Sequence, residues 1–237
     1  MEPDNQNIKE VAKAAAEVSK FGTQTVQTTE KILGFIAKVF KSPAEDTAGI
    51  IGDRLKLFRW ERQLAYVDKV NNILFAKGIT DTRAVPPKFS LPVIENASLE
   101  DDDELQKLWA NMLANAMNPT FTVNMRTAFI DIIKSLTILD VKILKTFYEA
   151  LKQNSSVDWN NILNYSLKKE QICQLLSIGQ EDYEVSVFNL FRVQCLAPAI
   201  ITGGISMGAE PLTVYKGSKA VTLTPLGVDF IKSAIEE

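Results

Sequence analysis

The stretch of this 237-residue chain best suited to chemistry is an unbroken acidic run, Glu100 to Glu104. Carboxylate oxygens are the ligands that hard cations such as magnesium prefer, so Asp101 to Glu104 could serve a metal-dependent nuclease. Such a site needs carboxylates that converge on one point, whereas successive residues of a helix fan out around its axis. Acidic side chains are also favoured at the positive end of a helix. We therefore expect a solvated helix start, with no metal site and no cofactor.

The chain contains no histidine. Without imidazole there is no Ser-His or Cys-His nucleophile pair, no histidine-ligated zinc and no histidine general base. The two cysteines, Cys173 and Cys195, lie in apolar helical contexts without Cys-x-x-Cys spacing, which predicts buried packing residues. We therefore expect no catalytic residues, no small-molecule substrate and no enzymatic activity.

The composition is that of an ordinary globular protein, with 46% hydrophobic and 23% charged residues and a formal net charge of -3. The length suffices for two core-bearing units. The negative charge disfavours broad nucleic-acid binding, and the basic stretch from Arg54 to Arg62 is typical of a solvated helix face. The start of the chain shows no apolar core of a secretory signal, which predicts a cytoplasmic location.

Residues 1–41 form the first predicted segment, an amphipathic helical one. Small or apolar residues recur at alternating spacings of three and four from residue 8 to residue 40, which predicts a continuous helical stripe. The tail from Glu30 to Lys41 is basic and amphipathic but too short to span a membrane. It has two interpretations: burial in a helical core, or contact with a partner or the surface of the inner membrane. The side chains that would make this contact are Ile32, Phe35, Ile36 and Phe40.

Residues 42–136 form the second predicted segment, a helical bundle. A long helix is expected from Pro43 to Lys77, with Gly78 ending it. The prolines between residues 81 and 92 predict an extended linker. The next helix is expected to begin at Ser98, capped in a Ser-x-x-Asp relation, and to run to Pro119 with Trp109 as the anchor of its apolar face. A further helix is expected over residues 123–136.

The Trp109 helix also carries a recognisable pattern of residues. Glu100-Asp101, Leu105-Gln106, Leu108-Trp109-Ala110 and Leu113-Ala114-Asn115-Ala116 follow one another, after PAEDTAGIIGDRLKLFRWER (Pro43 to Arg62) and Val85-Pro86-Pro87-Lys88. In this order the pieces resemble the abortive infection alpha (Abi-alpha) family of prokaryotic phage-defence proteins. The resemblance covers roughly residues 40 to 235. It implies a role in defence with Trp109, Leu113 and Asn115 in the structural motif, and it supplies no catalytic residues.

Residues 137–237 form the third predicted segment. Thr137 and Asp140 can form a capping box at the start of a predicted helix, and Asn154 is expected to end that helix. The remaining expected elements are helices over 168–177 and 182–196, strands over 212–215 and 220–223, and a closing helix from Thr224-Pro225 to Ile235. With Leu-Thr-x-x-Gly at residues 223–227, this order resembles a winged-helix domain with a β-hairpin. The whole chain is thus expected to be mainly α.

The predicted helix over residues 182–196 decides how such a domain would be used. In a DNA reader it would enter the major groove and offer polar or basic side chains to the bases. Its single basic residue is Arg192 and most of its side chains are apolar, which is typical of a buried helix. We therefore expect a non-enzymatic phage-defence protein acting through protein contacts or self-association. The alternative is a winged-helix regulator of a defence or toxin operon, touching DNA through Arg192, Lys216 and Lys219.

Overall fold

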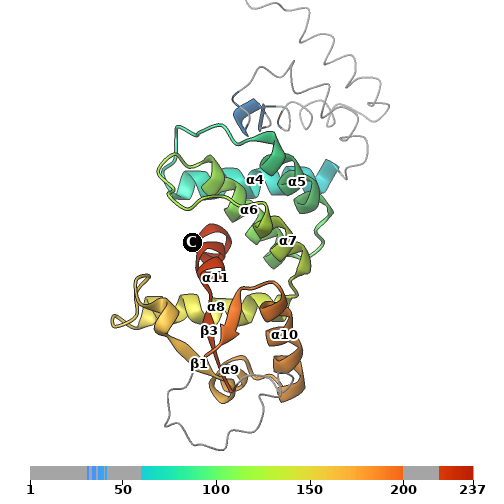
Figure 1. Ribbon diagram of the computed structural model, residues 1–237. Helices are drawn as coiled ribbons and strands as arrows, with labels where there is room; N and C mark the ends of the chain where they lie inside the picture. The colour runs from blue at the N-terminus through green and yellow to red at the C-terminus, as the bar shows by residue number, and fades with distance from the viewer. Residues whose placement is uncertain are drawn as a thin grey trace, which may run out of the picture. The chain divides into compact units, whose positions relative to one another are not determined.

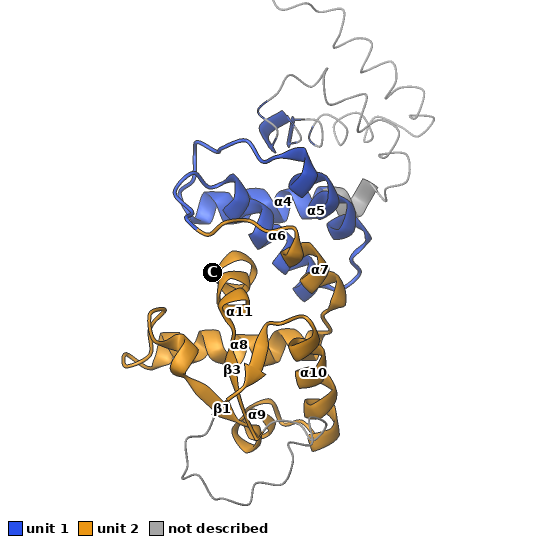
Figure 2. Cartoon of the chain, in the orientation of Figure 1, with its two compact units in different colours: residues 1–122 blue, residues 123–237 orange. Residues whose placement is uncertain are grey.

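The computed structural model is mainly helical with one small antiparallel sheet (Figure 1), which confirms the predicted class. It describes residues 60–199 and 219–236, together with Lys31, Gly34, Phe35, Ala37, Lys38, Val39 and Lys41. The chain divides into two compact units, residues 1–122 and residues 123–237 (Figure 2). Each unit is described by itself.

Unit 1 contains, within its described residues, α4 (Trp60–Ala76), α5 (Pro87–Leu99) and α6 (Asp103–Met117). α6 packs against both α4 and α5. From Leu105 to Met117 every residue except Lys107 is buried, so α6 is the central helix. α4 ends where the sequence predicted, because Gly78 takes the left-handed conformation (φ 66°) that glycine adopts without strain.

The extended linker predicted over residues 81–92 is wrong in its second half, because α5 begins at Pro87. A proline at the first helical position loses no hydrogen bond. Pro92 lies inside the helix, but the carbonyl it cannot bond belongs to Lys88, an exposed residue that water can reach. Burial of the stripe Phe89, Val93 and Ala97 stabilises the helix despite its prolines.

The predicted start of the Trp109 helix at Ser98 is also wrong. Ser98 is buried near the end of α5, where its hydroxyl donates to the carbonyl of Ile94 at 2.5 Å. α6 begins at Asp103, and its N-cap is Asp102. The Asp102 carboxylate accepts from the backbone N–H groups of the second and third helical residues, the arrangement of a standard N-cap.

Unit 2 contains the remaining described helices: α7 (Ala128–Ser135), α8 (Ile138–Gln153), η1 (Ile162–Asn164), α9 (Lys169–Leu176), α10 (Gln180–Arg192) and α11 (Pro225–Phe230), which continues as the π-helical η2 (Ile231–Ile235). The capping box predicted before α8 is confirmed. Thr137 N donates to Asp140 Oδ2 at 2.7 Å, and Asp140 N donates to Thr137 Oγ1 at 3.3 Å. Asn154 is the C-cap of the same helix, as expected.

The boundary between the units differs from the expected one after residue 136. α7 belongs to unit 2. The ring of Phe129 on α7 packs edge-on against Phe230 of α11, with centroids 6.0 Å apart. Such a pair adds to the free energy gained from burying both rings, so the apolar face of α7 is used in the second core.

The sheet of unit 2 has the strand order β1-β3-β2, with β1 (Ser166–Lys168) and β2 (Leu196–Pro198) each antiparallel to β3 (Ala220–Leu223). The predicted strand over residues 220–223 is therefore confirmed. Its predicted partner over residues 212–215 lies outside the described residues. β3 is the central strand and pairs with β1 along one edge and with β2 along the other. The sequence did not predict β1 or β2.

The closing helix begins at Thr224-Pro225 as predicted. Thr224 is its N-cap, and the Thr224 hydroxyl accepts from Gly227 N at 2.9 Å. Cys195 is buried beneath this turn, in agreement with a packing role. Among the described helices, none combines the length and apolar character needed to cross a membrane.

Candidate functional site

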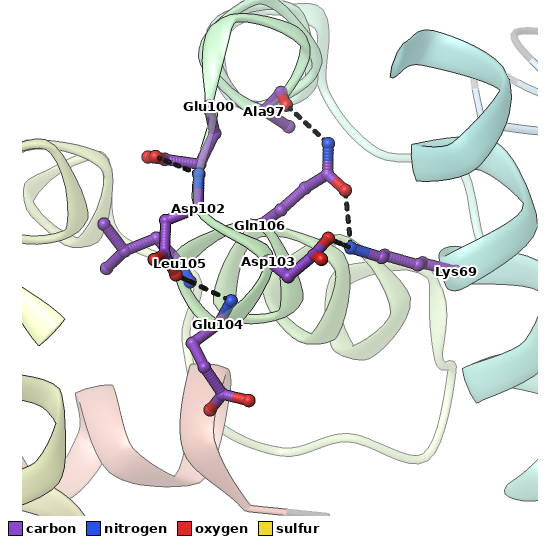
Figure 3. A network of polar contacts seen from close by, with 8 residues as sticks. All are labelled: Lys69, Ala97, Glu100, Asp102, Asp103, Glu104, Leu105 and Gln106. Atoms are coloured by element: carbon purple, nitrogen blue, oxygen red, sulfur yellow. Dashed lines mark hydrogen bonds and ion pairs between the residues drawn. The ribbon is translucent and has the colours of Figure 1, made fainter. Parts of the chain in front are cut away.

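The acidic run before α6 does not form a cluster of converging carboxylates (Figure 3). Glu100 Oε1 accepts from the backbone N–H of Asp102 at 3.2 Å, and Asp102 itself caps α6. The Asp103 carboxylate pairs with Lys69 Nζ on α4 at 2.7 Å, while the Glu104 side chain extends away from the others. Across the described residues, no group of three or more acidic or cysteine side chains is close enough to hold a metal ion.

The geometry instead gives this run an electrostatic and capping role. The first turn of a helix presents unpaired N–H groups and a partial positive charge. Asp103 and Glu104 lie in that turn, and Asp102 satisfies two of its N–H groups. The run therefore stabilises the start of the central helix of unit 1.

Gln106 is a residue whose role sequence reasoning missed. Its side chain is buried and joins α4, α5 and α6: Gln106 Oε1 accepts from Lys69 Nζ on α4 at 2.6 Å, and Gln106 Nε2 donates to the carbonyl of Ala97 on α5 at 3.3 Å (Figure 3). Both ends of the amide are used, as expected for a buried polar group. The only signal in the sequence was its place beside Leu105 in the family pattern.

The other end of α6 is compensated by cations from outside the helix. α6 has no basic residue in its last turn. Arg83 supplies one, since Arg83 Nε donates to the carbonyl of Ala116 and its backbone N–H to that of Met117, both at 2.8 Å. Lys77 Nζ donates to Asn115 Oδ1 at 3.1 Å. Positive charge at the C-terminal end is favourable because helix carbonyls there carry partial negative charge.

The three motif residues Trp109, Leu113 and Asn115 are at most 1% exposed. The carbonyl of Trp109 accepts from the Tyr66 hydroxyl of α4 at 3.2 Å, and burial raises the pKa of Tyr66 well above its ordinary value. Trp109 Nε1 is buried without a hydrogen-bond partner among the described residues. These positions are those of packing residues that hold α6 in place.

The predicted contact segment, Glu30 to Lys41, is only partly described, and Ile32, Ile36 and Phe40 lie outside the described residues. Phe35 is 4% exposed and Val39 is fully buried. The backbone is tied down as well, since Val85 N donates to the carbonyl of Val39 at 2.9 Å. For Phe35, the structure supports the interpretation of burial in a helical core.

Three lysines of the same segment make polar contacts with residues further along unit 1. Lys31 Nζ lies 3.9 Å from Asp68, Lys38 Nζ donates to Asn71 Oδ1 at 3.3 Å, and Lys41 Nζ donates to Asp81 at 2.8 Å. Each of these lysines thus contacts an acidic or amide oxygen elsewhere in unit 1. Exposed pairs of this kind contribute little free energy each, so the buried apolar side chains are the main attachment.

In unit 2, α10 is less buried than its sequence predicted. Its inner side consists of Tyr183, Ser186, Val187 and Leu190. On the opposite side, Val185 is 73% and Phe188 is 45% exposed. We use the name α10 face for the outward residues, which recur at helical spacing: Glu181, Asp182, Val185, Phe188 and Arg192.

Arg192, a predicted DNA-contact residue, is held within its own helix. Its Nε and Nη2 donate to Asn189 Oδ1 at 3.1 and 2.7 Å. Asn189 Nδ2 in turn donates to the carbonyl of Ser135 at 2.7 Å and to Asp140 Oδ2 at 2.8 Å. Asn189 therefore links the Arg192 guanidinium to the buried Asp140 carboxylate and fixes it at the end of the α10 face.

The other predicted DNA contacts lie by the sheet. Lys216 is outside the described residues, and Lys219 is exposed directly before β3. The carbonyl of Lys219 accepts from Lys169 N at 3.0 Å, and Lys168 lies opposite Ala220 in the strand register. The structure thus brings Lys168 and Lys219 to one end of the sheet, a juxtaposition that the sequence did not reveal.

Neither cysteine has the surroundings of a reactive thiol, which needs a lowered pKa. Burial, with a smaller effect of the Asp140 charge, raises the pKa of Cys195 to about 12. Partial burial also raises the pKa of Cys173, which outweighs the opposite effect of Lys169. Lys169 itself forms an ion pair with Glu184 at 2.6 Å.

Comparison with known proteins identifies a family. The family model described as abortive infection alpha matches residues 59–234, which is most of the chain and extends over both units. No curated protein matches significantly, and neither does any solved structure.

Proposed function

The chain belongs to the abortive infection alpha family, and from this premise we propose that it is a non-enzymatic, cytoplasmic phage-defence protein that acts by protein-protein contact through the α10 face. The family name supports the role in defence. The absence of histidine from the sequence and the separate partners of the acidic side chains support an action without catalysis.

The proposal treats unit 2 as a winged-helix module. Its elements follow the order α8, β1, α9, α10, β2, β3, and the sheet has the order β1-β3-β2 (Figure 1). In helix-turn-helix modules that read DNA, the second helix of the motif enters the major groove. The corresponding helix here is α10, so its outward side chains indicate what the module binds.

The observation that carries the proposal is the chemistry of the α10 face. Glu181 and Asp182 would repel phosphate, and Val185 and Phe188 offer no hydrogen bond to a base edge. Large apolar side chains that remain exposed on a helix are typical of a protein-binding surface. Arg192 is the one cation of the face and is engaged with Asn189.

Phage challenge of cells that express the chain tests this function. Val185→Asp places a charge in the middle of the α10 face and is expected to abolish protection. The matched control is Phe75→Asp, which alters an 87% exposed residue of unit 1 and should leave protection intact. Circular dichroism would establish that both variants fold. Full protection by the folded Val185→Asp protein would refute the proposal.

A DNA-binding regulator is the second candidate, and the pairing of β1 with β3 favours it by bringing Lys168 and Lys219 to one end of the sheet. Two lysines there could contact phosphate. Binding of duplex DNA that weakens steeply with added salt would support this function, because release of counterions makes phosphate binding salt-dependent. If the protein does not bind duplex DNA even at low salt, this second function is excluded.

Association of the segment from Glu30 to Lys41 with a membrane surface would require this segment to change its position. Phe35 is buried within unit 1 and could contact lipid only after this segment leaves its site. Co-sedimentation of the intact protein with anionic liposomes would support such a release. A protein that stays in the supernatant would end this interpretation.

A further inference from the structure

We propose that the occupant of the α10 face is a second copy of this chain, bound so that the two α10 helices lie antiparallel about a twofold axis. The inference rests on the proposed function of α10 as a docking surface and names its partner. A symmetric contact of this kind requires one surface to be complementary to itself.

The α10 face is self-complementary in its order of side chains. Glu181 and Arg192 lie at equal distances from the point midway between Val185 and Phe188. When two such helices run antiparallel with these midpoints together, Glu181 of each copy meets Arg192 of the other. Val185 of each copy then meets Phe188 of the other. With a rise of 1.5 Å per residue, the two charged ends are roughly 16 Å apart on each helix.

The charges of the face are available for such a contact. Glu181 and Asp182 are exposed and form no ion pair with any other described residue. Arg192 uses Nε and Nη2 on Asn189, and a guanidinium has five N–H donors, so others are left for a carboxylate. Since Asn189 already fixes the guanidinium, little side-chain freedom is lost on binding.

The centre of the face supplies the apolar area. Val185 is 73% and Phe188 is 45% exposed in the single chain, and pairing would remove both from water. A contact between two single helices is smaller than a standard interface, and interfaces below about 1,200 Å² are weak and transient. We therefore expect a dimer whose population rises with protein concentration. The face has an acidic end at Glu181 and a basic end at Arg192. A partner that is basic along its whole length would be repelled by Arg192, whereas an antiparallel second copy is attracted at both ends.

Sedimentation velocity of the full chain over a range of concentrations tests the proposal. Wild type is expected to dimerise reversibly. Arg192→Glu places like charges opposite each other at both ends of the pair, as does Glu181→Arg, and each is expected to raise the dimer dissociation constant about tenfold. An equimolar mixture of the two variants restores opposite charges at both ends, so a mixed dimer should form with near wild-type affinity. Lys142→Glu, at an exposed position of α8, is the matched control and should leave dimerisation unchanged.

Three results would overturn the proposal: a wild-type chain that stays monomeric throughout, a dimer that both charge reversals leave intact, or a mixture no more associated than its components. Circular dichroism identifies a variant that fails to fold, and Glu181→Arg then suffices because Glu181 is exposed and forms no ion pair with any other described residue. Failure of the pairing is distinct from failure of the proposed function. A monomeric wild type whose Val185→Asp variant loses protection would exclude self-pairing and retain docking to another protein.

Discussion

Replacing Gly227 by alanine tests the close packing of the first turn of α11 against the backbone of Cys195 in unit 2. A Cβ built on Gly227 would lie 2.1 Å from the carbonyl oxygen of Cys195 and 2.9 Å from its carbonyl carbon, whereas ordinary contacts begin near 3.4 Å. The obstacle is backbone, so the chain must shift by more than 1 Å. That carbonyl also accepts from Thr224 N at 3.1 Å, and the Thr224 hydroxyl donates to the carbonyl of Gln194. The shift therefore disturbs the turn that begins α11.

The magnitude follows from opposing contributions. Alanine is favoured over glycine in a helix by about 1 kcal/mol. Overpacking costs about 1–3 kcal/mol and each disturbed hydrogen bond about 1 kcal/mol. We expect a net loss of about 2–4 kcal/mol in the free energy of unfolding of unit 2. For a unit of this size that lowers the melting temperature by roughly 10 °C.

Thermal and urea unfolding followed by circular dichroism measure this loss. The matched control is Gly34→Ala, since Gly34 is a helical glycine with no atom within 4 Å of its built Cβ. That substitution is expected to be neutral or slightly stabilising. Gly227→Ala as stable as wild type would show that the contact with Cys195 does not restrict this position.

Three further predictions concern buried groups. In the folded protein Cys195 should not react with a thiol reagent at mildly alkaline pH and Cys173 should react slowly, whereas both react at once in denaturant. Burial raises the pKa of Tyr66, and it raises the pKa of Tyr183 to about 12, so above pH of about 10 the unfolded chain loses phenol protons that the folded protein keeps. The free energy of unfolding should therefore fall as the pH rises. Phenolate absorbance should appear only when the protein unfolds. Gln106→Leu leaves a buried carbonyl unpaired and should cost about 1–3 kcal/mol in urea unfolding.

The parts of the fold that the sequence predicted are those fixed by neighbouring residues. The Thr137–Asp140 box, the glycine after α4 and the Thr-Pro start of α11 act within one turn of chain. Such signals need no knowledge of the rest of the structure. The helix ends that these signals mark therefore agree with the structure to within a few residues.

The parts that the sequence did not predict depend on partners far along the chain. α5 forms through its prolines because Phe89, Val93 and Ala97 are buried. β1 and β2 have only three residues each and exist by pairing with β3. The same holds for the candidate site, since the exposure of Val185 depends on what covers α10 and cannot be read from its apolar character.

One buried carboxylate links stability and recognition in unit 2. Asp140 Oδ2 accepts both from Thr137 N, which starts α8, and from Asn189 Nδ2, which positions Arg192 on the α10 face. Its other oxygen, Oδ1, is buried without a hydrogen-bond partner among the described residues, a cost that the fixed geometry of the cap and of α10 offsets. Changing Asn189 would both release Arg192 and leave Asp140 less satisfied. The charges of the α10 face are therefore probed at Glu181 and Arg192, which are exposed, and not at Asn189.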